Sequence, residues 1–215
     1  MKMSDFEYEA DHTKHSIGGR GGHIFRRAFH IGMAIIPWAY YQYGNTAADL
    51  VSLTPIQLIA AIGIISFIFE LIRLKAGIVI VGQREYERYQ FSAVAWGCLS
   101  IMLTFVALSP WEVPSGAHAG WLTIPIILSL TFGDPAMGEA RRYKFDNKSV
   151  FLIGSSVCAL TWILCGYFFG TPYWLALIMG PLTAASEWPK LKWIDDNATM
   201  VLLPLAAVLM FSPFL

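Results

Sequence analysis

The chain has 215 residues, and its 15 Lys and Arg residues balance 15 Asp and Glu residues to give a formal net charge of zero. Only 14% of the residues are charged and 56% are apolar, whereas soluble globular domains carry about 25% charged residues. This composition excludes an ordinary soluble domain and predicts an all-α, polytopic integral membrane protein; we expect no nucleic-acid partner.

The N-terminal stretch MKMSDFEYEADHTKHSIGGRGG is acidic and Gly-rich, and it lacks the apolar segment of a cleavable signal peptide. We expect residues 1–24 to form a flexible cytoplasmic tail. Residues 25–215 are expected to form one transmembrane domain.

Seven apolar segments follow, at 29–43, 52–72, 91–109, 120–133, 149–169, 172–186 and 198–213. A helix needs about 20 apolar residues to cross a bilayer, so the pattern predicts a bundle of about seven transmembrane helices. The fourth and sixth segments are short enough to be tilted, broken or extended by their flanks. All 15 Lys and Arg residues fall in the N-terminal segment and in alternate connections. The positive-inside rule therefore places the N-terminus and these connections in the cytoplasm and the C-terminus outside.

The stretch IFRRAFH carries Arg26, Arg27 and His30 within about one helical turn, so that Arg27 and His30 share a face. One interpretation is a cluster that faces phosphate groups at the membrane surface. The other is a pair of stop-transfer arginines beside an incidental interfacial histidine.

The next charged stretch, FELIRL, places Glu70 and Arg73 three residues apart at the end of an apolar helix, a spacing that permits an ion pair. A glutamate near the membrane interior is unfavourable unless it is paired or functional. REYER follows at residues 84–88. We expect a structural ion-pair network here, with a phosphate contact from Arg88 as the functional alternative.

Acidic and basic residues alternate through TFGDPAMGEARRYKFDNKSVFLIG, residues 131–154. Membrane orientation requires only the basic residues, because acidic residues contribute little to it. A metal–nucleotide site needs both charges: carboxylate oxygens bind Mg²⁺ and cations bind phosphate oxygens. The alternative is a solvated, self-neutralised surface.

Three adjacent oxygen-bearing side chains, Asp195, Asp196 and Asn197, precede the last apolar segment. Adjacent aspartates repel each other unless a positive charge lies close to them, and Mg²⁺ would supply that charge. A helix N-cap formed by Asp196 or Asn197 is the alternative, and it does not exclude metal binding.

The order of these motifs resembles the membrane-bound polyprenol kinase family, which includes dolichol kinase, phytol kinase and CTP-dependent diacylglycerol kinases and is related to CDP-diacylglycerol synthase. The resemblance extends from Arg26 to Pro204. It rests on RRAFH, on FELIRL followed by REYER, on FGDPAMGEARRYK followed by NKSVFLIGS, and on ASEWPKLKWIDDNATMVLLP. The last of these motifs is the most specific.

The resemblance implies an enzyme that phosphorylates a lipid alcohol such as dolichol, phytol or geranylgeraniol, using CTP or another nucleoside triphosphate with Mg²⁺. It implies catalytic roles for Asp134, Asp195, Asp196 and Lys148, with the three aspartates as metal ligands. The implied nucleotide-binding residues are Arg141, Arg142, Lys144, Lys148, Ser149, Gly154, Ser155 and Asn197. Those implied to support phosphate binding or the active site are Arg26, Arg27, His30, Glu70, Arg73, Arg88 and Glu187.

Two other functions remain open. A CTP-dependent cytidylyltransferase would use similar charges to join CTP to a lipid phosphate. A seven-helix receptor or transporter is the non-enzymatic alternative, but residues 198–213 contain no Lys for a retinal Schiff base. A transporter would also place polar residues near the middle of the membrane, whereas the charges here gather at one surface.

Overall fold

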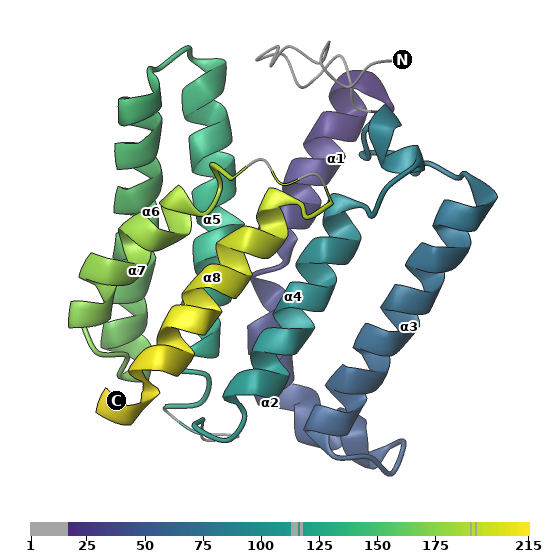
Figure 1. Ribbon diagram of the computed structural model, residues 1–215. Helices are drawn as coiled ribbons and strands as arrows, with labels where there is room; N and C mark the ends of the chain where they lie inside the picture. Colours follow the sequence, from purple (N-terminus) through teal and green to yellow (C-terminus); the bar gives the residue numbers. More distant parts are fainter. Residues whose placement is uncertain (1–16, 113–115, 117, 190, 192) are drawn as a thin grey trace.

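The computed structural model describes residues 17–112, 116, 118–189, 191 and 193–215. Within these residues the protein is all-helical and contains no strand (Figure 1), which confirms the predicted fold class. The elements are α1 (Gly19–Gly32), α2 (Ile35–Asp49), α3 (Pro55–Ala76), η1 (Glu85–Arg88), α4 (Ala93–Leu108), α5 (Thr123–Arg142), α6 (Asn147–Phe169), α7 (Trp174–Ala185), α8 (Asp196–Phe211) and η2 (Ser212–Phe214).

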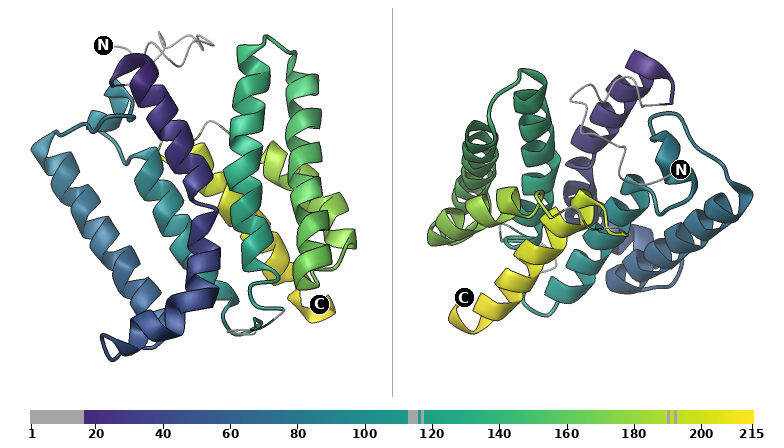
Figure 2. Two further views of the ribbon diagram at one scale, coloured as in Figure 1. Left: turned by 180° about the vertical axis from the view of Figure 1, so that it is seen from behind. Right: turned by 45° about the horizontal axis from the view of Figure 1, so that its top comes forward.

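The helices form a bundle in which α5, α6 and α7 lie on one side and α2 and α3 on the other, with α4 and α8 packed together between them (Figures 1 and 2). One end of the bundle carries the start of α1, the segment 77–92 and the α5–α6 turn; we call it the charged end. Here α8 begins well below the ends of α1, α5 and α6. The start of α8 is therefore recessed within the bundle.

Three helices are long and apolar enough to cross a membrane: Pro55–Ala76, Asn147–Phe169 and Asp196–Phe214. The helices α4 and α7 are apolar but shorter. Large apolar side chains are exposed along α3, among them Ile64, Phe69 and Ile72. Contiguous apolar surface of this kind marks contact with lipid or with another protein. These features are compatible with a membrane protein, and the seven-span topology stays a prediction.

The first predicted span, 29–43, is not one continuous helix, because α1 ends at Gly32 and α2 begins at Ile35. Pro37 supplies the physical reason: it has no N–H to donate to the carbonyl of Met33 one turn earlier. That carbonyl instead accepts the N–H of Ile36 at 3.0 Å. The predicted boundary between tail and domain also needs correction, since residue 24 lies within α1. Residues 1–16 of the predicted tail lie outside the described residues.

The charged stretch after the fourth apolar segment is largely helical, whereas the sequence suggested a loop. Helix α5 continues to Arg142, and only residues 143–146 connect it to α6. The extension is held by close packing: a Cβ atom on Gly133 would meet Cys158 Sγ at 2.6 Å, and Met137 is fully buried. Arg141 and Arg142, which were expected to bind nucleotide phosphates, therefore lie in the last turn of α5, and Lys144 lies in the short connection that follows.

The predicted ion pair between Glu70 and Arg73 is confirmed. Arg73 Nη2 donates to Glu70 Oε1 at 2.7 Å, and both side chains are buried. Arg73 also donates to the carbonyl of Gln90 at 2.9 Å, and Glu70 accepts the N–H of Ser92 at 2.6 Å. The pair thus anchors the segment between α3 and α4 to the end of α3, which is a structural role.

Candidate functional site

The start of α8 carries the two adjacent aspartates of the sequence motif. Asp195 is the N-cap, and its carboxylate accepts the N–H of Asn197 at 3.1 Å. The sequence interpretation named Asp196 or Asn197 as the cap, so the cap lies one residue earlier than expected. Asn197 is buried, and its side-chain amide donates to the carbonyl of Ala93 at 3.3 Å. This bond joins the start of α8 to the start of α4, so Asn197 has a structural partner.

The electrostatic environment of Asp195 is unfavourable for its charge. Burial raises the pKa of Asp195, the neighbouring Asp196 carboxylate raises it further, and Arg26 opposes both effects. Two carboxylates that share a partly dehydrated position favour protonation or the binding of a cation. This is the property expected of a metal-binding pair.

Arg84, which precedes η1, is a cation beside these two aspartates. Burial lowers the pKa of its guanidinium, but Tyr86, Asp196 and Asp195 raise it by more, so the group remains charged. Arg84 Nη1 donates to the hydroxyl of Tyr86 at 2.6 Å, and the guanidinium lies 5.8 Å from the centre of the Tyr86 ring. Tyr86 therefore orients the guanidinium beside the aspartate pair.

Glu87 organises the groups around the aspartate pair. It is only 1% exposed, and its Oε1 atom lies 3.1 Å from Arg26 Nη1. The same carboxylate accepts the N–H groups of Arg84 at 2.9 Å and of Ala93 at 3.1 Å. Sequence reasoning assigned no site role to Arg84 or Glu87. The available signal was a carboxylate three residues after an arginine, a spacing that lets the side chain bond back to the backbone.

A second group of charges joins α1 to α5. His30 is buried, and its Nε2 atom lies 3.5 Å from Asp134 Oδ2. Arg27 Nη2 lies 3.0 Å from Glu139 Oε1, and Arg27 Nη1 donates to the carbonyl of Pro135 at 3.1 Å. Arg27 and His30 therefore share one face of α1, as their spacing predicted. Gly138 leaves room for this contact, because a Cβ atom there would lie 3.2 Å from Arg27 Nη2.

A third group lies between α5 and the segment after α7. Both terminal nitrogens of Arg141 donate to the two carboxylate oxygens of Glu187, which is 2% exposed. Burial raises the pKa of Glu187, and the nearby charges of Asp134 and Asp196 raise it further. The Arg141 guanidinium lowers this pKa and so opposes both effects. Glu187 is therefore influenced by the charges of both Asp134 on α5 and Asp196 on α8. We refer to the three groups of charged residues together as the charged centre.

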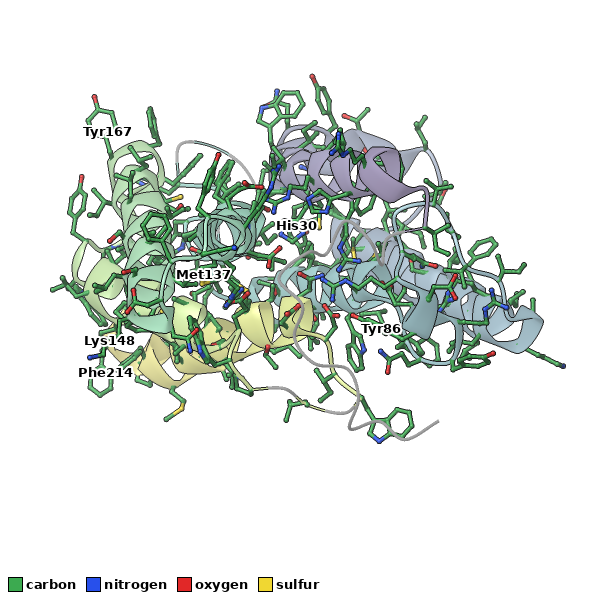
Figure 3. All side chains as sticks on the ribbon, turned by 90° about the horizontal axis from the view of Figure 1, so that it is seen from above. His30, Tyr86, Met137, Lys148, Tyr167 and Phe214 are labelled. Carbon is green, nitrogen blue, oxygen red and sulfur yellow. The ribbon has the colours of Figure 1, made fainter. Side chains whose placement is uncertain are left out.

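Several predicted phosphate-binding cations are not part of this centre. The side chains of Arg88, Arg142, Lys144 and Lys148 are exposed, and Arg142 Nη1 lies 3.5 Å from Glu139 on its own helix. Viewed from above, Lys148 lies at one edge of the molecule, well apart from His30 and Tyr86 (Figure 3). The expected single cluster of Arg141, Arg142, Lys144 and Lys148 is thus divided, and only Arg141 reaches the charged centre.

The expected Ser–Gly phosphate cradle on α6 has another role. The N–H of Ser149 donates to the Asp146 side chain, which caps α6. A Cβ atom on Gly154 would overlap Met137 Sδ, and Ser155 is also buried. Gly154 and Ser155 therefore belong to helix packing in the interior of α6, where backbone N–H groups are already bonded within the helix.

The predicted set of three aspartate metal ligands does not form within the residues that the structure describes. No group of three or more His, Cys, Asp or Glu side chains there could hold a metal ion, and Asp134 lies against His30. Asp195 and Asp196 still fit Mg²⁺, because this ion is commonly held by one or two carboxylates and completes its shell with water and substrate phosphates. The metal prediction is thereby narrowed to these two side chains.

Comparisons with known protein families, with characterised proteins and with solved structures gave no significant match to this chain.

Proposed function

We propose that this protein is a membrane-embedded kinase that transfers a phosphoryl group from a Mg²⁺-bound nucleoside triphosphate, expected to be CTP, to a lipid alcohol. The observation that carries the proposal is the half-buried pair Asp195 and Asp196, which lies beside the cations of Arg26 and Arg84. Phosphoryl transfer depends mainly on positioning and on neutralising phosphate charge, and these residue types supply both.

Each charged group has a proposed role. Asp195 and Asp196 would hold Mg²⁺, which would neutralise negative charge on the phosphate groups of the nucleotide. Arg84 and Arg26 would donate to phosphate oxygens, and Glu87 would hold Arg26 and the backbone of Arg84 in place through the contacts described above. Because these contacts come from α1, the 77–92 segment and α8, the nucleotide would bridge three parts of the chain.

Glu187 is the proposed acceptor of the proton that leaves the lipid hydroxyl. Burial raises the pKa of this carboxylate, which makes it a stronger base. Arg141 holds both of its oxygens and so fixes its orientation. Arg141 is accordingly a positioning residue in this proposal.

The membrane context matches the two substrates. A bundle with three apolar helices and an exposed apolar exterior suits an acceptor that is dissolved in the bilayer. The proposed topology has seven spans, a cytoplasmic N-terminus and an external C-terminus, and it would place the charged end in the cytoplasm with the nucleotide. The lipid hydroxyl and the water-soluble phosphate donor would then meet at one surface.

A transfer assay with purified protein in detergent tests the proposal. CTP labelled in either the α- or the γ-phosphate, together with unlabelled ATP, GTP and UTP as competitors, would be combined with a panel of lipid alcohols and lipid phosphates. The γ label should appear on a lipid alcohol only when Mg²⁺ is present, and Asp196→Asn should lose this activity. Lys75→Ala, which changes an exposed residue at the end of α3, is the matched control and should retain it.

The same assay distinguishes the alternatives. Appearance of the α label on a lipid phosphate would indicate a cytidylyltransferase. Equal transfer by wild type and Asp196→Asn would refute the kinase. So would the absence of γ-phosphate transfer to every acceptor in the panel when each of the four nucleotides is supplied with a γ label in turn.

A further inference from the structure

The end of the bundle opposite the charged end carries the α2–α3, α4–α5 and α6–α7 connections and the C-terminus (Figures 1 and 2); we call it the aromatic end. Aromatic residues gather there from α2, from the α4–α5 connection, from the facing ends of α6 and α7 and from η2, and each is between 41% and 80% exposed. We call this set the aromatic girdle; it consists of Tyr43, Trp111, Tyr167, Phe168, Tyr173, Trp174 and Phe214. Exposed apolar surface that recurs on several elements at one end indicates contact with something other than water.

The aromatic end is also poor in charge. Its segments contain no Lys or Arg, and their only acidic residues are Asp49 and Glu112; the segments are 43–54, 109–122, 167–174 and 211–215. The charged end, by contrast, exposes Lys75, Lys144 and Lys148. The two ends of the bundle therefore suit different surroundings.

The carboxylate of Glu112 is bonded within the protein. It accepts the N–H groups of Leu122 at 2.7 Å and of Thr123 at 2.6 Å. The hydroxyl groups of Thr123 and Tyr41 donate to it as well. These four bonds take the place of water around the charge, so Glu112 does not oppose contact between this end and a less polar medium.

The aromatic girdle is spread around the bundle. Seen from above, Tyr167 and Phe214 lie at separate places along the edge of the molecule (Figure 3), and Tyr43 belongs to α2, on the other side of the bundle from α6. A protein partner would cover one contiguous face, whereas a planar interface contacts all sides at one level. Trp and Tyr combine an apolar ring with a polar N–H or O–H group, and they are enriched at the head-group level of bilayers.

Two helices on opposite sides of the bundle give the spacing between the aromatic end and the exposed cations of the charged end. On α6, Tyr167 follows Lys148 by 19 residues, which is about 29 Å at 1.5 Å per residue. On α3, Lys75 follows Pro55, the first residue of the helix, by 20 residues, or about 30 Å. Both lengths match the hydrocarbon core of a bilayer, which is about 30 Å thick.

We infer that the aromatic girdle lies in the lipid head-group layer on the face of the bilayer opposite the charged end. The partner is the head-group layer of zwitterionic lipids, because the aromatic end offers no Lys or Arg to an anionic lipid. The inference goes beyond the proposed function, since it holds whether or not the protein transfers a phosphoryl group.

Depth measurement by electron paramagnetic resonance tests the inference on the full chain in phosphatidylcholine vesicles. Nitroxide labels are attached to single introduced cysteines, and their collision rates with oxygen and with a water-soluble nickel chelate give their depth. Cys158 and Cys165 are buried, so only Cys98 has to be replaced. Cys98→Ser is the smallest change, and its hydroxyl can keep the contact with Ser66.

The labelled variants are Tyr43→Cys, Tyr167→Cys and Phe214→Cys, which sample three elements of the aromatic girdle. Leu160→Cys is the matched control, because Leu160 lies on α6 and is 54% exposed but does not belong to the girdle. All four positions are exposed, so these variants should fold normally.

The three girdle labels should lie within about 6 Å of one another in depth, the thickness of one head-group layer. The label at position 160 should lie about 10 Å deeper, because this residue precedes Tyr167 by seven residues. Girdle labels that meet the nickel chelate as often as a free label in water would overturn the inference. Low collision rates with both reagents would mean that protein, such as a second copy of this chain, covers the girdle, and would overturn it too. No phosphoryl transfer is measured, so failure of the proposed function leaves this test unaffected.

Discussion

Replacing Asp195 by Asn separates the structural role of this residue from its proposed metal-binding role. Asn and Asp are similarly good N-caps, so the substitution preserves the bond to the N–H of Asn197. It removes only the charge. Because burial and Asp196 raise the pKa of Asp195, the folded state holds this proton more tightly than the unfolded state does. The contribution of Asp195 to stability therefore becomes less favourable as pH rises from the unfolded pKa through the folded pKa.

The expected size of the effect follows from the pKa shift. Each pKa unit corresponds to about 1.4 kcal/mol. Asp195 is half-buried and partly screened by solvent, so we expect Asp195→Asn to stabilise the folded protein by on the order of 1–2 kcal/mol at pH 8. For a chain of this size that is an increase in Tm of about 2–8 °C. The increase should shrink as the pH falls toward about 4, the pKa of an unfolded aspartate.

Two control variants separate the effect of the charge at position 195 from the effect of the N-cap hydrogen bond. Asp195→Ala removes the cap as well, which costs about 1 kcal/mol and offsets part of the gain. Asp146→Asn makes the same chemical change at the N-cap of α6. There, hydrogen bonds from Ser149 lower the pKa of the exposed Asp146 carboxyl, so the charged form is favoured and no gain in stability is expected.

The assay is thermal unfolding in detergent between pH 4.5 and pH 8.5, followed by the fluorescence of the eight tryptophans and combined with phosphoryl transfer. Mg²⁺ with CTP should raise the Tm of wild type and leave that of Asp195→Asn unchanged, because the metal ligand is lost. Activity should be lost in the same variant. Near-normal turnover in Asp195→Asn would show that Asp195 is only a helix cap, and a lower Tm at pH 8 would refute the electrostatic reasoning.

Three further predictions concern the remaining groups of the charged centre and the topology. Arg84→Ala should raise the KM for the nucleotide by about tenfold or more, because a charge-assisted contact contributes roughly 1.5–3 kcal/mol. The KM for the lipid alcohol should be unchanged, and equal changes in both KM values would contradict a phosphate contact. Glu187→Gln should lower kcat more than it changes either KM and remove the acidic limb of the pH–rate profile, whereas an unchanged limb would exclude Glu187 as the base. Cysteines introduced at positions 116 and 146 should be labelled from opposite sides of the membrane, and labelling from the same side would contradict the seven-span topology.

Local patterns in the sequence were sufficient to predict much of this fold. The apolar segments from 52–72 onward each correspond to one helix, because helix formation in a long apolar segment depends on composition and length. The Glu70–Arg73 pair and the shared face of Arg27 and His30 were also predictable, since both depend on spacing within one helix.

The parts that sequence reasoning missed depend on contacts between distant segments. Glu87 became important because the 77–92 segment folds back to meet Arg26 on α1 and the start of α4. The charges around Asp134 suggested a loop, but the helix there is stabilised by His30 and Arg27 from α1 and by Glu187 beyond α7. A pattern within one segment of the sequence cannot identify partners that come from distant segments.

The short length of α7 helps to determine where α8 begins and thus where the aspartate pair lies. Because α7 ends at Ala185, the chain crosses to the start of α8 below the ends of α5 and α6 (Figure 1). This crossing recesses Asp195 and Asp196 within the bundle, where loss of hydration makes a cation favourable. In the proposed function, this position would bring the charged phosphates to a partly dehydrated site where the aspartates favour a bound cation.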